Sequence, residues 1–418
     1  MKMRLLLLLI LLITLFSVST LSAQSETLIQ PDDLVYRGAF RLPQDASDDI
    51  GWLYSGHAMT HYPGGDDGGP DDGYPGSLFA TGHDWNQYVS EISIPVAVIS
   101  NNVNDLNVAR TLQDFSDLRG DLYDYLEMPH AALAYLPPQG EQSSSKLYFA
   151  WTEHLGMENF ASSHGWSELD LSNPQTAGLW SIAGHEHYET VNYMFAIDPK
   201  WAAEYTAGML LATGRFREGG QVGCGPALFA IAPWNEGNPP APGTALPAIT
   251  LLQYENFEAP DNQKLNDYHD ADEWSGGEWL TVGGRSAVIF AGTKGLGEYW
   301  YGFANGVVHP EEGPYPEVPP YPYDNRGFWS TDYEAQILFY DPADLGAVAR
   351  GEMEAWQPQP YAVLSIDDYL FGNEDSPVQK QMRVGAIAFD VEHGLLYVFE
   401  PTAYEEAYSV IHVWQMME

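Results

Sequence analysis

The chain has 418 residues, of which 58 are acidic and 17 basic, and its formal net charge at pH 7 is −41. Such a surface repels nucleic acid and anionic membranes, because binding to phosphate groups requires lysine and arginine. It also disfavours a polyanionic substrate unless a local basic pocket receives it. The single cysteine, Cys224, cannot form an intrachain disulfide, so the fold must depend on a hydrophobic core.

The N-terminal segment has the layout of a secretory signal peptide. Lys2 and Arg4 precede an apolar run that begins at Leu5, and the small residues Ser22 and Ala23 suit cleavage after Ala23. The run is shorter than the about 20 apolar residues that a membrane helix needs. We therefore expect residues 1–23 to be removed and residues 24–418 to form one secreted or periplasmic domain of a bacterial protein, with no membrane span.

The rest of the chain consists of short apolar or alternating runs between turn signals, which is typical of β-strands. They fall into sets of four in which the second run resembles Leu-Phe-Ala-Thr-Gly, as in LFATGH, LLATGR and VIFAGT. In chain order, the runs of the first set begin at residues 57, 77, 88 and 107, and those of the second at 130, 146, 165 and 177. The third set begins its runs at 193, 209, 226 and 249, and the fourth at 279, 287, 336 and 361. The fifth set has three runs, which begin at 385, 395 and 409.

The last set lacks a fourth run, and one unassigned run, LVYRGAFRLP at residues 34–43, stands near the N-terminus. Pairing these two ends would close a ring. The pattern therefore predicts an all-β protein, a five-bladed β-propeller with four antiparallel strands per blade. A pair of β-sandwiches is the alternative that the strand pattern leaves open.

The predicted topology places many ionisable residues on one face. In an antiparallel blade, the chain before the first strand lies beside the end of the second strand, and the first strands surround the central channel. The residues at these positions are His57, His130, His185, His187, Glu278 and Arg383 before first strands, and His83, Asp84, Glu153, His154, Arg215, Arg217, Glu218, Lys294, Glu298 and Glu400 after second strands. A binding funnel is one interpretation, and histidines that only orient neighbouring strands are the other.

Two segments between strands stand out. The acidic segment 61–77 joins a first to a second strand on the opposite face, and Asp66, Asp67, Asp71 and Asp72 in it suit either Ca²⁺ or a solvated turn. Residues 295–332 form an insertion rich in Tyr, Trp, Pro and Gly, which we expect to lie over the funnel as a lid or a substrate platform.

The funnel suits two kinds of chemistry. In the first, carboxylates act as acid and base on a glycosidic bond; the candidate residues are Glu278, Glu153 and Glu400, tuned by Arg215 and Arg383. In the second, His57, His130 and His187 hold one divalent metal ion, Zn²⁺ or Mn²⁺, that serves hydrolysis or β-elimination. The candidate substrate-binding residues are Trp85, Lys294, Glu298, Trp300 and Tyr301.

This architecture resembles the five-bladed propeller glycosidases of the arabinanase and invertase-like type. Those enzymes carry an aspartate at the start of the first blade's inner strand, where this chain has His57 in SGHAMTHYP, and the second blade offers His130. The resemblance implies a carbohydrate-active enzyme, with hydrolysis preferred, and we expect it to be an exported monomer. A metal-dependent polysaccharide lyase or hydrolase and a non-catalytic glycan-binding propeller remain alternatives. Different ionisable residues in each blade favour a single central site, and hence an enzyme.

Overall fold

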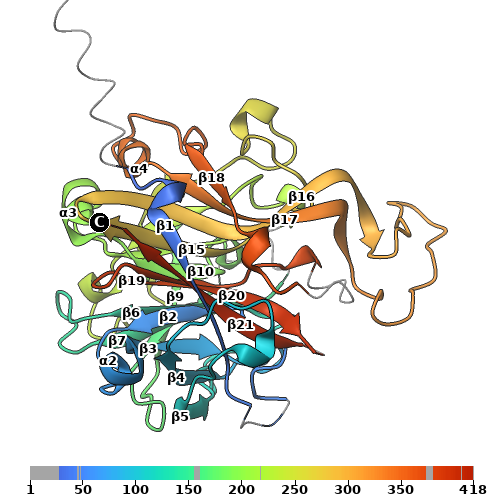
Figure 1. Ribbon diagram of the computed structural model, residues 1–418. Helices are drawn as coiled ribbons and strands as arrows, with labels where there is room; N and C mark the ends of the chain where they lie inside the picture. Colours follow the sequence, from blue (N-terminus) through green and yellow to red (C-terminus); the bar gives the residue numbers. More distant parts are fainter. Residues whose placement is uncertain are drawn as a thin grey trace, which may run out of the picture.

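The computed structural model describes residues 28–44, 47, 49–154, 161–216, 218–372, 380–405 and 407–417, so the expected signal peptide lies outside the described residues. Five antiparallel sheets surround one axis (Figure 1). Their innermost strands touch one another in the closed cycle β2, β6, β10, β15, β19 and back to β2. The predicted five-bladed β-propeller is confirmed, and the sandwich alternative is wrong.

The strand boundaries follow the predicted runs closely, blade by blade. Blade 1 contains β2 (Met59–Tyr62), β3 (Gly73–Thr81), β4 (Val89–Pro95) and β5 (Thr111–Ser116). Blade 2 contains β6 (His130–Leu136), β7 (Lys146–Thr152), β8 (His164–Ser167) and β9 (Ala177–Ile182). Blade 3 contains β10 (Tyr193–Ala196), β11 (Leu211–Gly214), β12 (Leu228–Ile231) and β14 (Ala248–Leu252). Blade 4 contains β15 (Glu273–Val282), β16 (Arg285–Phe303), β17 (Arg326–Tyr340) and β18 (Ala362–Ser365), and blade 5 contains β19 (Ile387–Asp390), β20 (Leu395–Tyr404), β21 (Tyr408–Met416) and β1 (Leu34–Arg41).

The N-terminal strand β1 closes the ring as predicted. It pairs antiparallel with β21, from Leu34 opposite Met416 to Arg41 opposite Val410. A bulge interrupts this pairing next to Gly38, whose φ is +117°. A Cβ atom there would lie 2.4 Å from the backbone of Val98, so this position requires glycine. The bulge therefore brings β1 against the loop between β4 and β5 and joins blade 5 to blade 1.

The second strand of each blade is apolar because both faces of the sheet are covered by neighbouring blades. All of β7 and β20 is buried, and so are the last six residues of β3 and residues 287–293 in the first half of β16. This explains why the runs read as continuous apolar stretches and not as an alternating pattern. Large buried rings such as Trp166 on β8 and Trp180 on β9 lie on outer strands, while alanines such as Ala132 on β6 and Ala388 on β19 lie on inner strands.

Short helices occupy the connections. The α-helices are α2 (Gly69–Asp72), α3 (Pro199–Tyr205) and α4 (Pro342–Ala349), and the 3-10 helices are η1 (Pro31–Asp33), η2 (Val103–Asp105), η3 (His187–Glu189), η4 (Glu218–Gly220), η5 (Pro233–Asn235), η6 (Asp261–Gln263) and η7 (Asp367–Tyr369). No helix in the described part of the chain has the length and apolar character needed to cross a membrane. The three α-helices lie on the side of the disc opposite the β16–β17 hairpin (Figure 1).

The structure adds two features to the predicted strands. A two-residue strand, β13 (Ala245–Leu246), pairs parallel with β9 and gives blade 2 a fifth strand. Much of the 295–332 insertion is not a loop, because β16 continues to Phe303 and β17 starts at Arg326, with Lys294 opposite Glu334 and Phe303 opposite Arg326. The resulting two-stranded hairpin projects beyond the body of the propeller (Figure 1).

Candidate functional site at the mouth of the propeller

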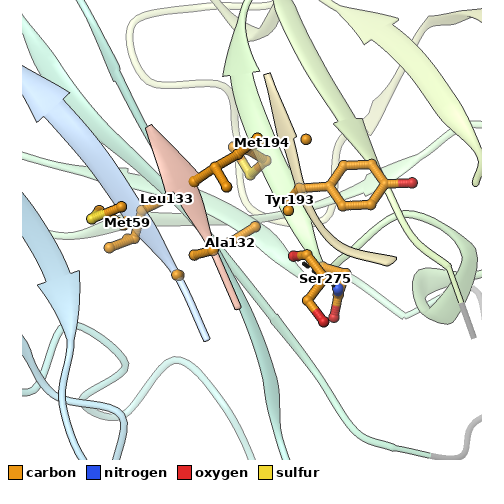
Figure 2. A pocket seen from close by; sticks show the side chains of 12 residues that line it. Met59, Ala132, Leu133, Tyr193, Met194 and Ser275 are labelled. Carbon is orange, nitrogen blue, oxygen red and sulfur yellow. Dashed lines mark hydrogen bonds between the residues drawn. The ribbon is translucent and has the colours of Figure 1, made fainter. Parts of the chain in front are cut away.

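The central channel is closed at its waist by small and apolar residues. A cavity of about 10 Å³ remains there, which is room for about one water molecule. It is lined by Ala58, Met59, Ala132, Leu133, Asn192, Tyr193, Met194, Ser275, Gly276, Gly277, Ala386 and Ile387, which come from all five inner strands or the residues just before them (Figure 2). A substrate must therefore bind at one end of the channel and not inside it.

The end at which the inner strands begin, called the mouth here, gathers imidazoles and carboxylates from blades 1 and 2. His57 and Asp84 come from blade 1, and His130, Glu153 and His154 come from blade 2; all five are partly exposed. The Nδ1 atom of His130 lies 2.9 Å from the side-chain oxygen of Asn192 on blade 3, and its ring stacks on that of His154 at 5.9 Å. These five residues are called the mouth cluster below.

Electrostatic effects link His57 with Asp84, and His130 with His57 and His154. Burial lowers the pKa of His130 well below its ordinary value, and the nearby Arg215, His154 and His57 lower it further. Burial also lowers the pKa of His57, against the opposing effect of the Asp84 carboxylate. Both imidazoles are therefore uncharged at neutral pH, and each retains a nitrogen that can accept a proton.

Arg215 holds the backbone around the mouth cluster. Its guanidinium donates to the carbonyl oxygens of Glu153 at 3.4 Å, His154 at 3.3 Å and Tyr188 at 3.2 Å, and it lies 5.0 Å from the centre of the Tyr188 ring. The side chain is only 1% exposed. Arg215 therefore positions the segment after β7 against the segment before β10, and it adds positive charge next to His130.

The structure does not bring the three predicted metal ligands together in one site. His187 is buried, and its Nδ1 atom lies 2.7 Å from the hydroxyl of Thr152. Within the described ranges, no three His, Cys, Asp or Glu side chains gather closely enough to hold a metal ion. In the acidic 61–77 segment, Asp66 instead forms an ion pair with Arg110 at 2.9 Å.

Three other predicted site residues form hydrogen bonds or ion pairs with residues outside the mouth cluster. Glu400 is fully buried and accepts hydrogen bonds from the backbone of residues 371 and 372 and from His412. Arg383 forms an ion pair with Asp367 at 2.9 Å. Lys294 donates to both carboxylate oxygens of the buried Asp272 at 2.9 and 3.0 Å. The structure places none of the three in the mouth cluster.

Glu278 lies deeper than the sequence suggested. Strand β15 starts at Glu273, five residues earlier, so Glu278 is inside the strand and lies just beyond the waist residues Ser275 to Gly277. Its carboxyl group accepts a hydrogen bond from the backbone of Trp279 at 3.0 Å and lies near the backbone of Phe389 on blade 5. Burial raises its pKa to about 8, so this group is largely protonated at neutral pH.

Exposed aromatic rings flank the mouth. Trp85 follows β3 and is 75% exposed, with its ring 5.1 Å from that of His83. Tyr125, in the segment that leads into β6, is 89% exposed. The other predicted substrate-binding residues, Glu298, Trp300 and Tyr301, lie on the β16–β17 hairpin. Flat exposed rings of this kind can stack on the apolar face of a sugar.

Sequence reasoning missed Asn192 and Tyr125. Asn192 directly precedes β10, the same position in blade 3 that His57 and His130 occupy near the starts of their inner strands. The positional rule applies to Asn192 as well, but asparagine is not ionisable, so the prediction for blade 3 fell on His185 and His187 instead. Tyr125 had no signal of its own, because exposure of a single ring depends on the fold.

Comparison with known proteins adds no family to this picture. No family model matches the chain, and no similar protein was found among the curated ones. The propeller fold is thus shown by the structure alone, and the likeness to arabinanase and invertase-like enzymes remains one of architecture.

Proposed function

We propose that the protein is an exported carbohydrate-active enzyme, a glycoside hydrolase in class, whose active site is the mouth cluster. The observation that carries the proposal is the meeting of uncharged imidazoles and carboxylates from two blades beside exposed aromatic rings. Hydrolysis of a glycosidic bond needs one group that protonates the leaving oxygen and another that activates water. The mouth cluster offers both kinds of group at a place that substrate can reach.

The roles follow from the surroundings of each residue. His57, next to the Asp84 carboxylate, is the candidate base, because the carboxylate stabilises the imidazolium formed when a proton is taken up. Glu153, from the second blade, is the candidate acid. His130, held by Asn192, orients the substrate through its free ring edge. Glu278, one of the three catalytic carboxylates predicted from the sequence, lies beyond the waist and has no role in this proposal.

A second candidate is β-elimination of an acidic sugar without a metal. The observation in its favour is the positive charge of Arg215 within electrostatic range of His130. A carboxylate on the substrate would offset that charge and raise the pKa of His130, which would then serve as a stronger base. The two reactions give different products, since elimination leaves a double bond that absorbs ultraviolet light.

The test uses the purified mature protein on neutral and uronate-containing polysaccharides, with reducing ends and ultraviolet absorbance followed together. New reducing ends without absorbance indicate hydrolysis, and both signals together indicate elimination. Asp84→Asn and Glu153→Gln should each lower kcat about 10²- to 10⁴-fold. Asp170→Asn is the matched control, since Asp170 lies in the connection between β8 and β9 on the opposite face and should keep the normal rate. Binding without turnover on every substrate, or full activity in both mouth variants, would overturn the proposal.

A further inference from the structure

One face of the β16–β17 hairpin carries a row of aromatic side chains. Tyr299 and Tyr301 are two residues apart on β16 and so point to the same side. Phe328 pairs directly with Tyr301 across the hairpin and shares that side. These three rings, together with Arg326 and Tyr315 toward the tip, are called the aromatic strip below.

The strip is preformed and open to solvent. The rings of Tyr301 and Phe328 are 5.1 Å apart, and the Arg326 guanidinium lies 5.9 Å from the centre of the Tyr301 ring. Tyr315 stacks on His309 at 4.8 Å with the two planes within 12°. Tyr299 is 52% exposed, Tyr301 38% and Tyr315 61%. Ring–ring contacts hold the rings in place, so a ligand would not have to order them.

The base of the strip touches the rim of the mouth. The Tyr299 ring lies 4.8 Å from that of His269, in the segment that leads into β15. Phe328 packs on Gly219, in the segment after β11, where a Cβ atom would approach its ring to 2.3 Å. The Gln381 amide donates to the Phe328 carbonyl at 2.9 Å and ties the hairpin to the segment before β19. From this base the hairpin extends away from the body (Figure 1).

We propose that the aromatic strip binds a stretch of an uncharged polysaccharide chain whose other end lies in the mouth. Tyrosine rings present flat apolar faces with a polar edge, which suits sugar rings that are apolar on their faces and hydroxylated at their edges. A row of such rings that starts at the mouth and runs outward suits a long chain better than a small molecule. The proposal deepens the proposed function, because it names the class of substrate that the enzyme takes.

The negative charge of the protein favours an uncharged polysaccharide over charged ligands at the strip. The chain carries a net charge of −41, and Glu311, Glu312 and Glu317 lie on the exposed connection at the hairpin tip, so a polyanionic glycan or a nucleic acid would be repelled. The strip itself consists of aromatic rings and Arg326, and the exposed aliphatic side chains Leu296, Val308 and Val318 of the hairpin and its connection are not part of it. An uncharged chain of hydroxylated rings suits both the negative charge of the protein and the aromatic composition of the strip.

The experiment measures binding of the full chain to soluble neutral polysaccharides (arabinan, galactomannan and mixed-linkage β-glucan) by affinity gel electrophoresis, with polygalacturonate as the charged comparison. The double variant Tyr299→Ala/Tyr301→Ala should weaken binding to the preferred neutral polymer about tenfold or more, because both stacking faces are removed. Tyr321→Ala is the matched control: this ring is 74% exposed on the tip loop but outside the strip, and its loss should leave binding unchanged. Melting curves check that each variant is folded.

The outcomes separate the two proposals. The strip variant should lose the preference for long polymers over short oligosaccharides that reach only the mouth, while Asp84→Asn should lose turnover and keep polymer binding. Unchanged polymer binding in the double variant, preference for polygalacturonate, or strip-dependent capture of a protein in place of a glycan would overturn the inference about the strip. If every mouth variant keeps its turnover, only the proposed function is overturned.

Discussion

The mouth cluster and the seam within blade 5 use the same kinds of side chain for different purposes. In the seam, which consists of Tyr36 on β1, Glu400 on β20 and His412 on β21, His412 Nε2 lies 2.8 Å from the Glu400 carboxylate and its Nδ1 lies 2.9 Å from the Tyr36 hydroxyl. Glu400 and His412 are both fully buried. In the mouth cluster, by contrast, the imidazoles and carboxylates keep access to solvent.

One arrangement of protons satisfies the whole seam. The Tyr36 hydroxyl donates to Nδ1, the Nε2–H group donates to Glu400, and the backbone N–H groups of Phe371 and Gly372 donate to the same carboxylate at 3.0 and 2.8 Å. This series of hydrogen bonds joins the N-terminal strand, two further strands of blade 5 and the end of blade 4. Its position at the closure of the ring indicates a structural role, because broken contacts there would open the propeller.

The comparison shows that residue type alone does not identify a site. A glutamate and a histidine next to each other stabilise the fold when they are buried and hydrogen-bonded, and they become available for chemistry when they keep a solvent-facing edge. The two regions therefore predict opposite mutational behaviour: substitutions in the seam should change stability, and substitutions in the mouth cluster should change turnover. The following experiments test that separation.

The largest effect on stability is expected for His412→Ala. The substitution leaves the buried Glu400 carboxylate without its histidine partner, and loss of one member of a buried pair costs about 3–5 kcal/mol of unfolding free energy. Denaturant unfolding monitored by tryptophan fluorescence measures it. His393→Ala is the matched control, because His393 is exposed and its ring lies 2.7 Å from the Asp390 carboxylate, so its loss should cost about 1 kcal/mol or less. Equal costs for the two variants would show that burial does not distinguish the seam.

The next effect concerns Glu278 and depends on pH. Its pKa is raised to about 8 in the folded protein, so between pH 5 and 8 the unfolded chain binds fewer protons at this group than the native state does. Stability contributed by the group is therefore present at low pH and is lost as pH rises, by up to about 1.4 kcal/mol per unit. The difference in unfolding free energy between wild type and Glu278→Gln should fall over this range.

Two outcomes of the Glu278 experiment bear on the comparison. A difference that stays flat with pH would mean that burial in the channel wall does not raise the pKa of Glu278. Turnover of Glu278→Gln should stay normal, because the waist separates this residue from the mouth.

Much of the fold could be predicted because the buried strands leave a local signal. Continuous apolar runs between turns identified all four strands of most blades. One unassigned run near the N-terminus and a last set without a fourth run predicted the closure by β1. The start of β15 was missed for a physical reason. Gly276 and Gly277 resemble a turn in the sequence, yet they belong to strand β15. Glycine is needed at both positions because Cβ atoms there would lie 2.9 Å from the Gly385 carbonyl and 3.0 Å from the Tyr193 ring. Blades approach most closely near the axis, where glycine is the residue that fits.

The candidate site was only partly predictable, because hydrogen-bond partners come from remote parts of the chain. Topology alone brought His57, His130 and Glu153 to one face. It gave no sign that Lys294 is bound to Asp272, because that contact depends on how the segment before β15 packs. The sequence did not predict the two strands of the hairpin, because the proline and glycine residues at its tip are typical of a loop. The alternate spacing of Tyr299 and Tyr301 along β16 is too short a strand signal beside them.

The smallest expected effect comes from Tyr36→Phe, which removes only the hydroxyl that donates to His412. Loss of one such hydrogen bond should lower the unfolding free energy by about 1 kcal/mol, while the ring keeps its contacts with Tyr369 at 4.5 Å and Trp414 at 5.0 Å. A double-mutant cycle with Glu400→Gln shows whether the seam acts as one network. Coupling through His412 predicts that the double variant costs less than the sum of the two single variants. Strict additivity would reduce the seam to independent contacts, and the contrast with the mouth cluster would then rest on burial alone.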